Sequence, residues 1–200
     1  MYNNMTVVRQ AFTRESADAR RADLIEATAA CLAAHGLAGT NVRAICAKAG
    51  VSAGLLRHYF AGIDDLIAAT YRATSDRMDA IFAGAVDSAG PDPRARLTAY
   101  LTASFRPPVT DPELLGAWTA FWALARNDAR MAGIHAESYA GYRQRLGELL
   151  VACGARDPGR LAILLTAMVD GLWLELSLDA RSFGADAAVQ MVEHAVAALV

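Results

Sequence analysis

The sequence predicts an all-α protein of about nine helices, in which an N-terminal three-helix unit precedes a larger helical region. Three observations predict this class. Alanine is abundant along the whole chain, and alanine has the highest helix propensity. Apolar residues recur at spacings of three and four, without the sustained alternation typical of strands. Glycine and proline are few, 15 and 6 of 200 residues, which argues against disorder.

Most of the predicted helices have a recognisable start or stop signal. Gly36 is placed to end the first helix, and Asn41 and Ser52 are N-cap residues of the two short helices that follow. Asp64 and Asp65 lie in the first turn of the fourth helix, where the helix dipole favours negative charge. Three later helices begin with aspartate followed by proline, a cap before a preorganised first residue. The predicted helices span residues 17–35, 42–49, 53–59, 63–86, 93–105, 112–126, 128–153, 158–178 and 185–200.

Charge is distributed unevenly along the chain. The formal net charge is −2, with +3 over residues 1–60 and −5 over residues 61–200. No carboxylate occurs between Glu26 and Asp64, although arginine, lysine and histidine all occur there. A basic segment without carboxylates favours a surface that approaches phosphate groups.

Residues 40–60 are predicted to form a helix-turn-helix. Two short helices joined by a glycine turn can cross steeply only where the contact residues are small, as Ala49 and Gly50 are. Ile45 and Leu56 are expected to form a small core against the first helix. In such a unit the second helix projects from the surface and enters the major groove of DNA.

The expected DNA contacts follow from this geometry. Backbone N–H groups at Ser52 and in the turn after it suit a phosphate, and Arg43 and Tyr59 would fix the register through other phosphates. Arg57 is the long donor on the outer side of the helix and can read guanine in bidentate fashion. An ordinary helical hairpin with a solvated Arg57 is the alternative. The residues expected to contact DNA are Thr40, Asn41, Arg43, Ser52, Ala53, Gly54, Leu55, Arg57, His58 and Tyr59.

This segment resembles the N-terminal domain of the TetR family of transcriptional repressors. The shared features are Gly50-Val51-Ser52 at the turn and Tyr59-Phe60 at the end of the recognition helix. The chain departs from the family at Arg57, where a tyrosine is usual. It also departs at Ile63, where a lysine that contacts phosphate is frequent, so one phosphate contact is in doubt.

The resemblance implies a ligand-responsive repressor that binds a palindromic operator. It implies a DNA-binding domain over residues 17–77 and a ligand-binding and dimerisation domain over residues 78–200. The last two predicted helices suit a homodimer interface, because the final helix has one apolar stripe and the helix before it is apolar nearly all round. A two-fold operator requires a two-fold protein. A monomeric core is the alternative.

Aromatic residues gather in the larger region, where three of them share one helix face at positions 118, 121 and 122. Such a cluster is typical of a buried core, but aromatic faces also attract quaternary ammonium groups. Asp170 and Glu175 lie in a mostly apolar helix and could balance such a charge. The residues expected to bind a ligand are Phe105, Trp118, Phe121, Trp122, Tyr139, Tyr142, Asp170 and Trp173.

Two motifs resemble the BetI-type subgroup of the TetR family, whose best-known members repress choline-to-betaine genes. They are Ala117-Trp118-Thr119-Ala120-Phe121-Trp122-Ala123 and Asp170-Gly171-Leu172-Trp173-Leu174. With the N-terminal domain, the resemblance covers most of the chain from about residue 20 onward. It implies choline or a related amine as effector. Because these motifs are less specific for ligand than for subgroup, a regulator of the same family that responds to another small molecule is the alternative.

Other classes of protein find little support in the sequence. The four histidines are scattered, no catalytic or metal-binding constellation occurs, and no cofactor is expected. The longest uncharged apolar runs have 12 and 9 residues, whereas a membrane span needs about 18. The sequence shows no signal peptide, and three cysteines without paired spacing suit reduced thiols. We therefore expect a cytoplasmic protein that is no enzyme and has no membrane partner. A helical adaptor that binds protein is a further alternative, against which the carboxylate-free segment argues.

Overall fold

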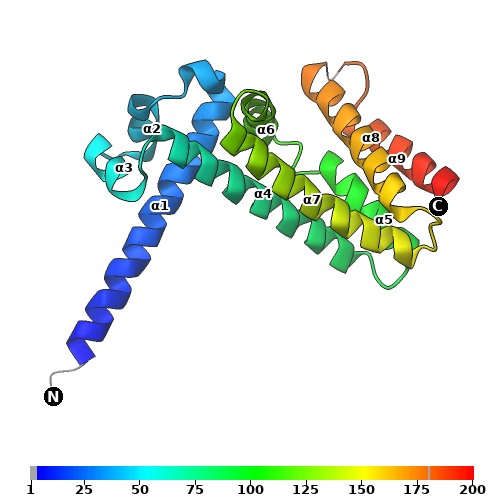
Figure 1. Cartoon of the computed structure of the whole chain (residues 1–200), viewed down its shortest axis with the longest axis horizontal. Coiled ribbons are helices and arrows are strands. Elements are labelled where there is room, and N and C mark those ends of the chain that lie inside the picture. The colour runs from blue at the N-terminus through cyan, green and yellow to red at the C-terminus, as the bar shows by residue number, and fades with distance from the viewer. Residues whose placement is uncertain (1–3, 180) are drawn as a thin grey trace.

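The computed structural model describes the backbone of residues 4–179 and 181–200, and the side chains of residues 17–179 and 181–200. Within these ranges the chain forms nine α-helices, one short 3-10 helix (η1) and no strand, which confirms the predicted all-α class (Figure 1). The helices are α1 (Asn4–Gly39), α2 (Val42–Ala49), α3 (Ala53–Tyr59), α4 (Ile63–Ser88), α5 (Pro93–Thr102), η1 (Ala103–Phe105), α6 (Pro112–Ala125), α7 (Ala129–Ala152), α8 (Pro158–Leu178) and α9 (Ala185–Leu199).

The helix boundaries lie close to those predicted, and α2, α3 and α8 have the predicted bounds. The first helix differs most, because it begins at Asn4 and not at residue 17. It is interrupted at Gly36, whose φ of 59° lies in the left-handed region that favours glycine. The helical run therefore ends where the sequence predicts it, and the following residues turn the chain toward α2.

The three Asp-Pro starts are not equivalent. Asp92 and Asp157 each accept a hydrogen bond from the backbone N–H three residues later. Asp111 lies at the N-cap of α6, but its side chain accepts no such bond. The helix that begins after Asp92 is shorter than predicted, because its last turn tightens into η1.

Two hydrophobic cores organise the molecule, and α4 contributes to both. The smaller core lies between α1, α2, α3 and the start of α4, and it buries Ile45 and Leu56 as predicted. The larger core includes Tyr71 and Met78 of α4 together with residues of α5 to α9. The domain boundary predicted between residues 77 and 78 falls within this continuous helix. Any displacement of α4 therefore changes the packing of both cores.

A glycine lets α6 approach α1 closely. A Cβ atom at Gly116 would lie 2.9 Å from both the Cα atom and the carbonyl oxygen of Ala33. Figure 1 shows α6 beside the part of α1 that leads into the small core. The two units are thus joined by a helix-to-helix backbone contact as well as by α4.

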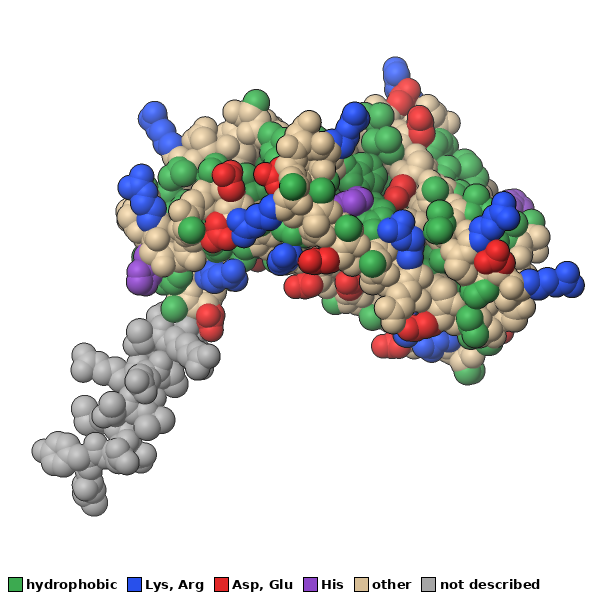
Figure 2. Space-filling view, viewed as in Figure 1, with side chains coloured by type: hydrophobic (Ala, Val, Ile, Leu, Met, Phe, Trp, Pro, Cys, Tyr) green, Lys and Arg blue, Asp and Glu red, His purple; other side chains and the backbone are tan. Residues whose placement is uncertain are grey.

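Helices α8 and α9 carry exposed apolar side chains. The exposed fractions are 60% for Ile163, 52% for Leu164 and 72% for Leu178, and Met191 and Leu199 on α9 are exposed as well. Figure 2 shows hydrophobic side chains gathered toward this end of the visible face. Among the described helices, α8 is long and apolar enough to cross a membrane, with a mean hydropathy of 1.7 over a window that is 28% buried. The sequence argument missed this because it considered only uncharged runs.

Candidate DNA interface and ligand cavity

The turn between α2 and α3 is held by side-chain caps and a glycine. Asn41 Oδ1 accepts a hydrogen bond from the Ala44 N–H at 3.0 Å, and Ser52 Oγ accepts one from the Leu55 N–H at 3.2 Å. Gly50 follows α2 with a φ of 66°, again in the left-handed region. The chain therefore reverses in three residues, which is the geometry of a helix-turn-helix.

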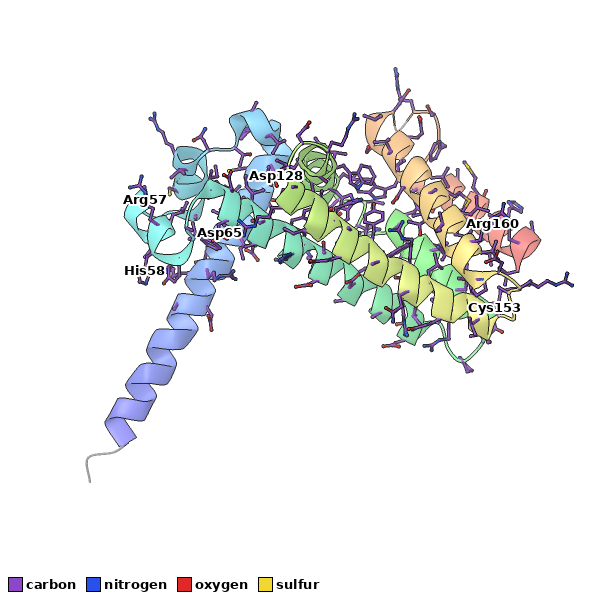
Figure 3. The ribbon with its side chains drawn as sticks, in the orientation of Figure 1. Arg57, His58, Asp65, Asp128, Cys153 and Arg160 are labelled. Carbon is purple, nitrogen blue, oxygen red and sulfur yellow. The ribbon has the colours of Figure 1, made fainter. Side chains whose placement is uncertain are left out.

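Helix α3 lies at one end of the molecule, where Figure 3 shows Arg57 and His58 on it. In the described part of the chain no ion pair engages Arg57. Tyr59 is half-buried against the small core, and Leu55 is also half-buried. The predicted contacts that are exposed to solvent are Asn41, Arg43, Ser52, Ala53, Gly54, Arg57 and His58.

Thr40 is the one predicted DNA contact that the structure buries. It is 7% exposed, and its hydroxyl donates a hydrogen bond to the carbonyl oxygen of Gly36 at 2.7 Å. The hydrogen bond stabilises the turn between α1 and α2, so Thr40 can position α2 without contacting DNA itself.

A cavity lies in the larger unit, between α4, α6, α7 and α8. It encloses about 50 Å³ of free volume and is partly open to solvent. All three tryptophans of the chain line it. The lining residues are Ser75, Met78, Asp79, Phe82, Ser104, Trp118, Trp122, Ser138, Tyr139, Tyr142, Val169, Asp170 and Trp173.

A chain of hydrogen bonds places one carboxylate against the aromatic wall. Trp122 Nε1 donates to the hydroxyl oxygen of Tyr139 at 3.1 Å, and that hydroxyl donates to Asp170 Oδ1 at 3.2 Å. Burial raises the pKa of Asp170 to about 6, against the opposing effects of the Tyr139 hydrogen bond and of Arg143. At neutral pH the cavity therefore contains a partly desolvated negative charge.

Positive charge stays outside the cavity wall. Among the described residues that line the cavity there is no lysine, arginine or histidine. Arg143 stacks over the Tyr139 ring, with the guanidinium carbon 5.7 Å from the ring centre, but it is not a lining residue. The cavity thus combines electron-rich ring faces with a carboxylate, which suits a cationic ligand.

Three buried polar atoms lining the cavity have no hydrogen-bond partner. They are Ser75 Oγ, Tyr142 Oη and Trp173 Nε1. Ser104 lies beside the Tyr142 hydroxyl without forming a hydrogen bond of good geometry. Buried polar groups are almost always satisfied in folded proteins, so these three atoms are free to bond to water or to a ligand in the cavity.

Six of the eight residues predicted to bind a ligand line this cavity, and two do not. Phe105 is 2% exposed in the larger core, and Phe121 stacks on Tyr71 with ring centres 4.3 Å apart. Glu175 is exposed to solvent and also lies elsewhere. Sequence reasoning followed the aromatic cluster of the later helices, so it missed all four α4 residues, Phe82 included, as well as two serines and Val169, which are not aromatic. The lining residues that it missed are Ser75, Met78, Asp79, Phe82, Ser104, Ser138 and Val169.

Polar contacts connect the N-terminal parts of α4 and α7. The Tyr71 hydroxyl and His135 Nδ1 are hydrogen-bonded at 3.0 Å. Nearer α3, Arg130 donates to Asp65 Oδ1 at 2.7 Å, which lowers the pKa of Asp65 together with a hydrogen bond from the Ala61 N–H. Figure 3 shows Asp65 at the start of α4, close to where α7 begins after Asp128. The cavity helix α7 is thus tied to the segment that follows the recognition helix.

Comparison with known proteins identifies both units. Residues 24–70 match the family model described as bacterial regulatory proteins of the tetR family, and residues 93–200 match the one described as BetI-type transcriptional repressor, C-terminal. The chain belongs to the BetI-type group of the TetR family. The resemblance inferred from the sequence is confirmed, and the protein is a helix-turn-helix transcriptional repressor and not an enzyme.

Relatives of this BetI-type chain agree in sequence and in structure. The regulator BetI of Paraburkholderia xenovorans is 32% identical over 86% of this chain and 88% of its own length, and that of Burkholderia thailandensis is 31% identical. A transcriptional regulator from Pseudomonas aeruginosa is 41% identical, with a TM-score of 0.83 over 91% of this chain and 90% of its own. A regulator from Saccharomonospora viridis, solved in complex with choline, has the same fold at 17% identity, with a TM-score of 0.78 over 87% of this chain and 93% of its own.

Proposed function

We propose that this repressor is a homodimer whose two α3 helices hold an operator, and that a small organic cation in the aromatic cavity releases it. Regulators of this family bind operator DNA and small-molecule effectors. The single observation that carries the choice of effector class is the cavity itself, where three tryptophans and two tyrosines surround Asp170. Its target being DNA, the protein acts in the bacterial cytoplasm.

The DNA side of the proposal rests on exposure and charge. Arg57 reads a base edge, because it is the long donor on α3 and is not engaged within the described protein. Ser52 and the N–H groups after it bind one phosphate, and Arg43 binds another. His58 and Tyr59 lie beside Arg57 with their rings edge to face, 5.0 Å apart, which limits the directions in which His58 can reach the groove. The small exposed residues Ala53 and Gly54 let the helix approach the bases closely.

The dimer side rests on α8 and α9. Exposed leucine, isoleucine and methionine side chains on two neighbouring helices form a surface of the kind that is covered in an assembly. Pairing this surface across a two-fold axis makes a four-helix interface, and it explains an apolar helix that is only partly buried in one subunit. The two α3 helices would then lie in successive major grooves, about 34–36 Å apart.

The ligand side rests on the electrostatics of the cavity. A quaternary or primary ammonium group is attracted by the faces of Trp118, Trp122 and Trp173 and is neutralised by Asp170. The choline-bound regulator of Saccharomonospora viridis shows that a protein with this fold binds such a cation. We propose choline or a related amine as the effector of this chain.

Release follows from the way α4 and α7 are joined. Ser75, Met78 and Phe82 put α4 in the cavity wall, while the start of the same helix packs in the small core beneath α3. A ligand that separates α7 from α4 shifts both ends of α4. The two recognition helices then lose register with the grooves, for which a coupling free energy of about 1–3 kcal/mol is typical.

Tryptophan fluorescence tests the effector class directly, because all three tryptophans line the cavity. We expect choline to change the fluorescence of the intact protein, and dimethylbutanol, its uncharged carbon isostere, to bind at least about tenfold more weakly. The variant Asp170→Asn should bind choline more weakly than the wild type does, and its affinity for dimethylbutanol should be unchanged. Equal binding of the charged and uncharged compounds, or no response to choline and simple alkylamines at millimolar concentration, would refute a cationic effector.

A further inference from the structure

An open groove between α4 and α7 adjoins the cavity. Ser75, Asp79 and Ser138 line both spaces, so the two share a wall. The groove adds four residues, which are Arg72, Asp76, Ile134 and Glu137. A ligand seated among the tryptophans is therefore separated from the groove by these three small or polar side chains.

The groove holds two carboxylates that form no ion pair with the described residues, although Arg72 also lines it. Among the residues that the structure describes, neither Asp76 nor Asp79 forms an ion pair, whereas Glu137 is paired with Arg72 at 3.5 Å. Asp76 and Asp79 lie three residues apart on α4, where like charges destabilise a helix. A positive charge placed between them would relieve that repulsion.

The carboxylate of Asp79 is the one that reaches the cavity. The residue is exposed overall, yet burial of its carboxyl group and the neighbouring Asp76 raise its pKa. The pKa of Asp170 is raised by its own burial. Asp79 lies on α4 and Asp170 on α8, so the two carboxylates line the cavity from different helices.

Ser75 lies where the cavity meets the groove, and its hydroxyl is unsatisfied. It is 7% exposed and its Oγ atom has no hydrogen-bond partner. Other hydroxyl residues of α4, namely Thr70, Thr74 and Ser88, each donate to the carbonyl oxygen four residues earlier. Ser75 does not make this bond, so its hydroxyl is available to a polar group at that position, one helical turn from Asp79.

We propose that the preferred effector is a linear dication, an alkyl diamine or polyamine, that binds with one ammonium at Asp170 and the other at Ser75, Asp79 and Asp76. This rests on the cationic effector proposed above and adds a second cation subsite to it. The aromatic wall between the two positions covers the alkyl chain. A metal ion does not suit them, because no three metal-ligating side chains cluster anywhere in the described chain.

Two amines with the same carbon chain isolate the second charge. Cadaverine and pentylamine differ only in the second ammonium group, and tryptophan fluorescence measures binding of each to the intact protein. We expect cadaverine to bind about tenfold more tightly than pentylamine at low ionic strength. Asp79→Asn should remove this difference and leave the affinity for pentylamine unchanged, whereas Asp170→Asn should weaken the binding of both amines.

The matched control is Asp87→Asn, which removes a carboxylate from the exposed far end of the same helix, outside both spaces. It should leave both affinities unaltered. If pentylamine and choline bind but cadaverine binds no more tightly, or if Asp79→Asn weakens both amines equally, the second subsite is wrong and the cationic effector stands. If none of the three amines changes the fluorescence, the proposed cationic effector falls and the second subsite falls with it.

Discussion

At the scale of single residues, the proposal rests on two side chains, one in each unit. Arg57 is an exposed guanidinium on α3 that forms no ion pair with the described residues. Asp170 is a partly buried carboxylate held against Trp122 by way of Tyr139. Substitution of each residue tests the proposed role of one unit.

Removing the Arg57 side chain should weaken operator binding by about 1–3 kcal/mol, because a bidentate base contact is lost. Dimerisation should not change, since α3, which carries Arg57, lies at the opposite end of the molecule from α8 and α9 (Figure 1). An electrophoretic mobility shift assay with DNA from upstream of its own gene, at one stated salt concentration, measures the first effect. Sedimentation measures the second.

The control for that experiment is Arg94→Ala, an exposed arginine at the start of α5 close to Cys153, at the end of the molecule away from α3. It should leave operator binding unchanged. Equal operator affinities of the wild type and Arg57→Ala would show that Arg57 does not contact the operator.

Cation binding should weaken as the pH falls through about 6, because protonation removes the negative charge of Asp170. The sign follows from the raised pKa, since the carboxylate is ionised above that value and neutral below it. Titrating choline between about pH 8 and about pH 5 should show the loss. In Asp170→Asn the pH dependence should disappear; if it persists, another group governs it, such as Asp79, which also lines the cavity and whose pKa is also raised by burial.

At the scale of single elements, the sequence predicts starts and stops well because caps are local. Asn41, Ser52 and Gly50 act within four residues of themselves, so their effect can be read without knowledge of the fold. The aromatic run of α6 also predicts a cavity wall, but periodicity does not say which ring faces the cavity. Phe121 lies one turn from Trp118 and still stacks on Tyr71 in the core.

What could not be predicted depends on how elements meet. Thr40 is a polar residue of a type that often contacts DNA, but its hydroxyl donates a hydrogen bond to the carbonyl oxygen of Gly36 across a turn. From the sequence alone, the α4 face with Ser75 and Asp79 is expected to be a solvated helix surface. In the fold it lines a cavity together with residues of α7 and α8. Such residues have no local pattern, because their role is created by tertiary packing.

Gly116 provides the test at this scale. Gly116→Ala should destabilise the protein by about 1–3 kcal/mol, because the added methyl group would overlap the backbone of α1 at Ala33 and force the helices apart. Thermal unfolding measures the change. Gly84→Ala on α4, where nothing lies within 4 Å of the added atom, should instead stabilise by about 0.5–1 kcal/mol. An equal loss of stability in both variants would show that the close approach of α6 to α1 does not explain the glycine at position 116.

At the scale of the whole molecule, the proposed dimer rests on α8 and α9 and the proposed coupling rests on α4. The apolar surface that α8 and α9 expose suits a second copy of the chain, which would match the two-fold symmetry of an operator. In the proposed dimer, each recognition helix responds to the cavity of its own subunit through α4. Ligand binding and DNA binding are opposed in this proposal.

Charged substitutions test this assembly. The double variant Leu164→Glu and Leu178→Glu should sediment as a monomer, because it places carboxylates in the proposed interface. Its operator affinity should fall sharply, since one α3 helix replaces two. Val151→Glu is the control, at an equally exposed apolar residue on α7. A double variant that stays dimeric would place the interface elsewhere.

The most direct test of the central claim measures cavity occupancy and operator release in one titration. The amine with the lowest Kd by tryptophan fluorescence is added to the protein–operator complex, and bound DNA is followed by fluorescence anisotropy. We predict that operator release follows cavity occupancy over the same concentration range, and that Asp170→Asn binds the operator normally but is not released in that range. Full cavity occupancy with the operator still bound, or equal release of wild type and Asp170→Asn, would contradict the account.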